Sequence, residues 1–134
     1  MTAPDVSVVI AAYNAADTIE RAIRSALAQQ GVSVEVIIAD DCSTDTTRET
    51  VTALDDQALR LVPLDRNRGP GGARNAGFAA ARGRWIAVLD ADDTMRPDRL
   101  VRMIATAEQE NAAAVVDNLD VLHADGRAER MFPR

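Results

Sequence analysis

The chain has 134 residues, 47% of them hydrophobic and 27% charged, which is the balance of a single soluble globular domain and not of a disordered or fibrous protein. All 15 basic residues are arginines, which excludes a lysine Schiff base and the lysine of a phosphate-binding P-loop, and the net charge of −6 argues against a non-specific nucleic-acid binder. With one cysteine and one histidine the chain can form neither an intrachain disulfide nor a Cys/His zinc cluster, so any metal site must use oxygen ligands.

The first half of the chain alternates apolar runs of strand length with segments of helical periodicity. Buried strands are predicted at residues 6–11 and 34–39, and a third strand at 59–64. Between the first two strands we expect a helix that starts with a capping box of Asp17 and Glu20 and ends at Gly31. A second helix is expected to run to about Leu54, with its cap among residues 43–45.

Residues 66–72 contain three glycines and a proline, so we expect a loop there that leads into an alanine-rich helix at about 73–81. A fourth strand is predicted at 85–89. Pro97 suits the first position of the next helix. The buried stripe expected on that helix consists of Leu100, Met103, Ile104 and Ala107.

The last predicted elements are a fifth strand at 115–122 and a short strand after a hairpin turn at 125–126. Four successive strand-then-helix units predict an α/β fold, a three-layer sandwich in which a mainly parallel, Rossmann-like sheet carries helices on both faces. Ligands of such sheets bind at the carboxyl ends of the strands. Chemically active residues are therefore expected directly after the strands.

Polar clusters do follow three of the predicted strands. They are Tyr13 with Asn14, Asp40 with Asp41, and Asp90 with Asp92 and Asp93. Carboxylates gathered at one sheet edge repel one another, so a cation is expected there, either a divalent metal or the arginines of residues 66–74. Asp90 and Asp92 are two residues apart, so in an extended backbone their side chains point the same way and can share one Mg²⁺ or Mn²⁺. Such an ion takes its other ligands from water and substrate phosphates, which implies a diphosphate substrate.

The residues alone leave other interpretations open. The acids after the fourth strand could cap the next helix and bind nothing. Either Asp40 or Asp41 could accept the imide N–H of a pyrimidine, and Tyr13 could stack on a base or simply lie over the sheet edge. The segment 66–74 suits an anionic ligand but could equally be a solvated loop.

Four motifs occur in order along the chain: SVVIAAYN at 7–14, EVIIADDCSTD at 35–45, NRG at 67–69 with ARNAG at 73–77, and LDADD at 89–93. In order and spacing they resemble the family-2 inverting glycosyltransferases of the GT-A fold. The resemblance covers nearly the whole chain, but only the nucleotide-sugar half of such an enzyme. Many relatives have proline where Ala12 stands and glycine where Cys42 stands, and both departures affect loop geometry more than chemistry.

This resemblance implies roles for the matching residues. The nucleotide-binding set would be Ala11, Tyr13, Asp41, Arg74 and Asp90. Within it, Tyr13 and Asp41 would hold a uracil-type base, Arg74 would position the nucleotide, and Asp90 would lie near the ribose. Asp92 would ligate the Mn²⁺ or Mg²⁺ that binds the diphosphate.

The implied enzyme transfers a sugar, with inversion, from a nucleotide-diphospho-sugar, expected to be a UDP-sugar, to a saccharide or lipid-linked acceptor in surface or exopolysaccharide synthesis. Residues 1–134 would be its nucleotide-diphospho-sugar-binding portion. The acceptor-binding half and the general base are expected outside this chain, so the catalytic residue stays unknown. A cytoplasmic location is expected, and for the full-length protein the cytoplasmic face of the inner membrane. No apolar run in these residues is long enough to cross a bilayer.

Two other function classes are weighed against this one. A nucleotidyltransferase also binds a nucleotide with Asp-bound Mg²⁺, but it normally has a glycine-rich loop with a basic residue after the first strand, where this chain has residues 12–15, AYNA. A non-catalytic receiver-like signalling module has a similar sheet and paired acids, but it needs a lysine that the chain lacks. Both remain alternatives that titration with uridine diphosphate would separate from the glycosyltransferase.

Overall fold

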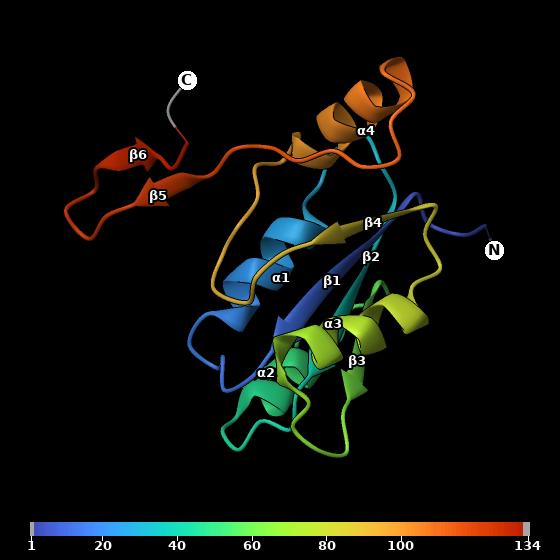
Figure 1. The fold of residues 1–134 in the computed structure, drawn as a ribbon. Helices are drawn as coiled ribbons and strands as arrows, with labels where there is room; N and C mark the ends of the chain where they lie inside the picture. Colours follow the sequence, from blue (N-terminus) through green and yellow to red (C-terminus); the bar gives the residue numbers. More distant parts are fainter. Residues whose placement is uncertain (1, 133–134) are drawn as a thin grey trace. The chain divides into compact units, whose positions relative to one another are not determined.

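The computed structural model describes residues 2–132, which fall into two compact units, one ending at Val101 and the other beginning at Arg102. A four-stranded, fully parallel sheet with the order β3-β2-β1-β4 forms the centre of the first unit (Figure 1). Its strands are β1 (Val6–Ala12), β2 (Val34–Asp40), β3 (Leu59–Pro63) and β4 (Trp85–Val88). The predicted α/β class and the four parallel strands are confirmed.

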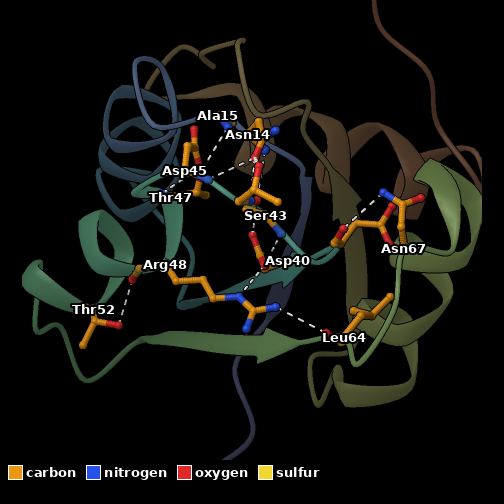
Figure 2. Close-up of polar contacts among 12 residues, drawn as sticks. Asn14, Ala15, Asp40, Ser43, Asp45, Thr47, Arg48, Thr52, Leu64 and Asn67 are labelled. Atoms are coloured by element: carbon orange, nitrogen blue, oxygen red, sulfur yellow. Dashed lines mark hydrogen bonds and ion pairs between the residues drawn. The ribbon is translucent and has the colours of Figure 1, made fainter.

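The sheet lies between helices on both faces. These are α1 (Ile19–Leu27), α2 (Thr47–Ala53) and α3 (Gly69–Ala80). The chain steps from β1 to β2 to β3 in one direction and then returns past β1 to β4, so right-handed crossovers place α1 and α2 on one face and α3 on the other (Figures 1 and 2). The central strands β1 and β2 are therefore covered on both sides, which is why their apolar residues run without alternation and are buried.

Helix α3 begins at Gly69, and the predicted loop at 66–72 is wrong over its second half. Pro70 fits because the first turn of a helix needs no donor from its backbone nitrogen. Further along, Ala73 and Gly77 are the buried positions of α3. Gly77 faces Val9 of β1 so closely that there is no room between them for a Cβ. Small residues thus let α3 lie directly on the sheet, as the low aromatic and high alanine content favours.

Replacing Gly77 with alanine is expected to lower the free energy of unfolding by about 1–3 kcal/mol, although alanine is the better helix former. The added Cβ would lie 2.4 Å from Cγ1 of Val9, which is itself fully buried. Urea denaturation measures the loss, with Gly71→Ala as the control, because a Cβ at that position meets no atom within 4 Å. Equal stability of the two variants would contradict the close approach of α3 to β1.

The predicted capping box of α1 is wrong. The helix begins at Ile19 after Thr18, whose side chain makes no capping hydrogen bond, and Glu20 instead pairs with Arg24 on the surface. The backbone N–H groups before the helix are bound from elsewhere: Thr47 Oγ1 accepts from Ala15 at 2.9 Å and Asp45 Oδ2 accepts from Ala16 at 3.2 Å. These contacts fix the segment before α1, whereas the N–H groups of Thr18 and Ile19 at the helix start donate to the carbonyl of Ala15.

Helix α2 begins at Thr47 after Thr46, whose side chain makes no capping hydrogen bond, so the cap expected among residues 43–45 is wrong. Asp45 nevertheless lies beside the helix start, where its Oδ1 accepts the backbone N–H of Thr47 at 2.9 Å. This one carboxylate therefore ties the start of α2 to the segment that precedes α1.

Helix α4 (Arg99–Gln109) begins two residues after Pro97, the predicted first position, whose carbonyl accepts the N–H of Gln30. Within the expected stripe, Leu100 and Ala107 are buried and the other two positions are half-buried. Among the described residues, no helix has the length and apolar character needed to cross a membrane.

The second unit ends in an antiparallel hairpin of β5 (Asp120–Leu122) and β6 (Ala128–Arg130) around Gly126. The predicted fifth strand at 115–122 is wrong over residues 115–119, which form no regular structure. At the start of the hairpin, the side chain of Asn118 accepts the N–H groups of Leu119 and Phe132 and donates to the carbonyl of Phe132, so side-chain hydrogen bonds take the place of strand pairing at this residue.

Candidate functional site

The carboxyl ends of the strands bring distant polar residues together, as the sequence predicts. Tyr13 and Asn14 follow β1, Asp41 follows β2, and residues 90–93 follow β4. The strand order reverses between β1 and β4, because the chain reaches β4 only after moving away to β3. At such a switch point the loops diverge and leave a crevice, which is the usual ligand position in a doubly wound sheet.

Three carboxylates cluster at the end of β4. Side-chain oxygens of Asp90, Asp92 and Asp93 lie within 4.8 Å of one another, and all three residues are exposed. The sequence predicts the first two as partners, and the structure adds Asp93, whose position beside them depends on the turn in which its N–H donates to the Asp90 carbonyl at 3.1 Å. Partial burial together with the charges of Asp92 and Asp90 raises the pKa of Asp93.

This cluster has the chemistry of a divalent cation site. Carboxylate oxygens are the ligands that Mg²⁺ and Mn²⁺ prefer, and three of them lie close enough to approach one ion. Carboxylates this close repel one another, which adds to burial in raising the pKa of Asp93, and a bound cation would offset that repulsion. The residues therefore fit the metal that the sequence predicts at Asp92.

Two arginines border the acidic cluster. Arg74 of α3 donates from a guanidinium nitrogen to Asp90 Oδ1 at 3.2 Å, with both side chains partly exposed. Arg21 of α1 donates to the backbone carbonyl of Asp92 at 3.4 Å. Arg74 is a predicted site residue, whereas Arg21 was missed because an arginine on the polar face of an amphipathic helix carries no local signal.

Asp41 is buried, with 4% of its surface exposed, yet only one of its two carboxylate oxygens accepts a hydrogen bond from the described residues. Its Oδ1 accepts the backbone N–H of Arg68 at 2.7 Å, and its own N–H donates to the carbonyl of Ala12 at 2.8 Å. Asn67 Nδ2 donates to the Asp41 carbonyl at 3.3 Å. Within residues 2–132, Oδ2 of Asp41 forms no hydrogen bond. It is an oriented acceptor with a vacant lone pair.

Both carboxylate oxygens of the neighbouring acid, Asp40, accept hydrogen bonds from other residues of the protein. It is fully buried, its Oδ2 accepts from Arg48 Nε at 2.6 Å and from the N–H of Ser43 at 3.1 Å, and its Oδ1 accepts from Ser43 Oγ at 2.5 Å (Figure 2). Of the two acids that the sequence leaves as alternatives, only Asp41 keeps an oxygen for a ligand. Arg48 was missed, since eight residues of sequence separate it from its partner.

Asn14 fastens the loop after β1 to the loop after β2. It adopts a left-handed backbone, φ 47°, and its Oδ1 accepts the N–H of Thr44 at 2.8 Å while its own N–H donates to Ser43 Oγ at 2.9 Å (Figure 2). The neighbouring Tyr13 is 54% exposed, so much of its ring is open to solvent. Ala11, by contrast, packs against the cluster of Ala39, Leu64 and Ala73 and pairs with Ala39 in the sheet.

Comparison with known proteins places these features in a family. The sequence model described as "Glycosyl transferase family 2" matches residues 7–131. The chain is 67% identical over 129 residues to the succinoglycan biosynthesis protein ExoO of Rhizobium meliloti (strain 1021), a match that covers 96% of this chain and 37% of ExoO. The chain thus spans little more than a third of that relative.

Two solved structures have the same fold. TarS of S. aureus (residues 1–349), described in complex with UDP, superposes with a TM-score of 0.73 at 29% identity, over 80% of this chain and 33% of TarS. A mannosyltransferase of Pyrobaculum calidifontis, described in complex with GDP-Man and Mn²⁺, gives a TM-score of 0.72 at 28% identity, over 80% of this chain and 33% of that one.

Proposed function

Since the chain belongs to glycosyl transferase family 2, we propose that it binds the nucleotide-diphospho-sugar donor of a sugar transfer, with a UDP-sugar as that donor. The observation that carries the proposal is the meeting of three loops at one sheet edge. They supply a buried carboxylate with a vacant oxygen, Asp41, an exposed aromatic ring, Tyr13, and a cluster of three acids after β4. The match to this family favours the donor site over a nucleotidyltransferase or a receiver-like module.

The base end of the proposed site is formed by Asp41 and Tyr13. A carboxylate is an acceptor only, so the vacant Oδ2 of Asp41 suits the imide N–H of uracil and repels the ring nitrogen of cytosine that carries a lone pair. The exposed ring of Tyr13 would stack on the base. UDP is the nucleotide described with TarS, which agrees with this choice of base.

The diphosphate end is formed by the acidic cluster. We assign Asp92 as a ligand of Mn²⁺ or Mg²⁺, with Asp90 and Asp93 beside it and Arg74 holding Asp90 in place. When bound, the metal would neutralise the charge of the leaving diphosphate. A crowd of acids cannot accept a diphosphate without such a cation, and the Mn²⁺ described with the Pyrobaculum mannosyltransferase supports one here.

The full reaction that we propose is attack of an acceptor hydroxyl on the anomeric carbon of the donor, with inversion. It needs a carboxylate that deprotonates the hydroxyl. We propose that this general base and the acceptor-binding surface belong to the rest of the enzyme, and that residues 1–134 supply donor binding. The likeness to ExoO, named as a succinoglycan biosynthesis protein, supports a role in exopolysaccharide synthesis, and a relative described as a glucosyltransferase acting on a diphosphoundecaprenol-linked sugar supports a saccharide or lipid-linked acceptor. We further propose that the complete protein acts at the cytoplasmic face of the membrane.

Replacing Asp41 with asparagine tests the base assignment. The amide oxygen can keep the hydrogen bond from the Arg68 backbone, while the NH₂ group takes the place of Oδ2 and opposes the uracil N–H. Calorimetric titration with UDP and CDP is expected to show a preference for UDP that falls about tenfold or inverts in the variant.

Asp17→Asn, a change at an exposed acid, is the control for this titration and should leave the ratio of the two affinities as it is. An unchanged ratio in Asp41→Asn would remove Asp41 from base recognition. Failure of the unaltered protein to bind UDP at all would overturn the proposed function itself.

A further inference from the structure

We propose that Arg48 is a positioning residue for nucleobase recognition, an inference that rests on the proposed role of Asp41. Arg48 lies on α2 and does not belong to the base site. It forms two hydrogen bonds, from Nε to Asp40 Oδ2 at 2.6 Å and from a terminal guanidinium nitrogen to the carbonyl of Leu64 at 3.3 Å (Figure 2). One side chain thus connects the end of β2 with the residue that follows β3.

The first of these bonds orders the turn that carries Asp41. The carboxylate of Asp40 accepts from Arg48 on one side and from the N–H and hydroxyl of Ser43 on the other. Asp41 and Cys42 lie between these anchors, and Cys42 is held in a left-handed conformation, φ 66°, which a non-glycine residue adopts only where its surroundings impose it. The direction of the Asp41 side chain therefore depends on the Asp40 carboxylate staying in place.

The second bond orders the segment that holds Asp41 from the opposite side. Leu64 is buried, its N–H donates to the Asp40 carbonyl at 2.9 Å, and its carbonyl accepts from Arg48. A few residues further on, Arg68 donates its backbone N–H to Asp41 Oδ1. Arg48 thus steadies both the chain that bears the acceptor and the chain that occupies the acceptor's other oxygen, which leaves Oδ2 as the oxygen for the base.

Loss of Arg48 would leave Asp40 as a buried charge without its cation. Such a charge is strongly unfavourable, so the carboxylate must turn toward water or the turn must open. Either movement shifts Asp41, and a hydrogen bond that distinguishes two bases is sensitive to displacements of well under 1 Å. The expected consequence is a loss of discrimination between bases and not only a loss of stability.

A double-mutant cycle tests this inference. The affinities for UDP and CDP are measured with Mn²⁺ present for the unaltered protein, Arg48→Met, Asp41→Ala and the double variant, at a temperature where thermal unfolding shows each to be folded. Arg48→Met is expected to lower the preference for UDP roughly fivefold, and Asp41→Ala with Arg48→Met to lose no more than Asp41→Ala alone. Arg48→Lys keeps a cation but lacks the planar guanidinium, so its preference for UDP should lie between those of the unaltered protein and Arg48→Met. If Arg48→Met does not fold, Arg48→Lys replaces it in the cycle.

Arg24→Met, which removes an exposed arginine from its pair with Glu20, is the matched control and should keep the full preference. A lower unfolding temperature with an unchanged ratio of affinities would reduce Arg48 to a structural residue and overturn the inference. Additive losses in the cycle would do the same. Absence of any UDP preference in the unaltered protein would instead count against the proposed function, so the two failures are distinguishable.

Discussion

Replacing Asp92 with asparagine is expected to weaken the binding of uridine diphosphate in the presence of Mn²⁺ by about 1–3 kcal/mol. The side-chain oxygens of Asp90, Asp92 and Asp93 lie within 4.8 Å of one another, so an amide in place of the central carboxylate removes one charged ligand from a compact set. The metal-bound diphosphate then loses part of its attachment to the protein. Isothermal titration calorimetry with and without a chelator measures the effect.

The metal dependence gives this experiment its internal control. With the chelator present, the unaltered protein should bind uridine diphosphate weakly and Asp92→Asn should bind it no more weakly, because the variant then loses no metal ligand and removes one charge that repels the diphosphate. Asp56→Asn, which alters an exposed acid between α2 and β3, should behave as the parent does in both conditions. Chelator-independent affinity of the parent protein would rule out the metal assignment.

Replacing Glu35 with alanine is expected to lower the free energy of unfolding by about 1–3 kcal/mol, since Ser7 Oγ and the Arg82 backbone N–H lose their acceptor. Glu35, on β2, is only 3% exposed. Its oxygens accept from Ser7 Oγ at 2.6 Å, from the Arg82 backbone and guanidinium at 2.8 Å each, and from Arg60 at 3.3 Å. Denaturant unfolding measures the loss, with the exposed Glu49→Ala as the matched control.

The same group gives the protein a defined pH dependence. Burial alone raises the pKa of Glu35, but the hydrogen bonds from Ser7 and Arg82 and the charge of Arg82 outweigh it and lower the pKa from 4.5 to about 2. Because the folded pKa is the lower one, the stabilisation of about 3 kcal/mol is complete above pH 4.5 and disappears as the pH falls toward 2. The stability difference between the parent and Glu35→Gln should shrink over that range, and a constant difference would refute the assignment.

The sheet could be predicted from the sequence because its central strands are short runs of apolar, often β-branched residues. The runs of β1 and β2 are covered on both faces, so most of their residues are apolar and often β-branched, with Ser7, Glu35 and Asp40 as the buried polar exceptions. The first turn of α3 could not be predicted in this way, since Gly69 and Pro70 suit a loop and a helix start equally well. The capping box predicted for α1 is wrong because the N–H groups of Thr18 and Ile19 donate to the carbonyl of Ala15, and Glu20 pairs with Arg24.

The candidate site also has residues whose roles the sequence predicts and residues whose roles only the tertiary structure shows. The spacing of Asp90 and Asp92 predicts a shared cation on the basis of an extended backbone. The structure has a turn there, in which the Asp93 N–H donates to the Asp90 carbonyl, and it is this turn that brings the carboxylates together. Spacing cannot distinguish Asp40 from Asp41, because adjacent acids have the same chemistry until the fold buries one against Arg48. Arg48 itself looks in sequence like any polar residue of a surface helix. Its partner is selected by the tertiary structure alone.

The position of β1 in the sheet also governs the order in which the protein can assemble. Val6 pairs with Val34 on one side, across a single helix, but with Trp85 on the other, after three helices have intervened. Contacts between residues far apart in sequence close larger loops, cost more chain entropy and form more slowly. On a ribosome, the segments that bear Tyr13, Asp41 and Arg68 emerge before β4 exists. A nascent chain can therefore complete first the edge that we propose to bind the base, and the acids that we propose to bind the metal and diphosphate join last.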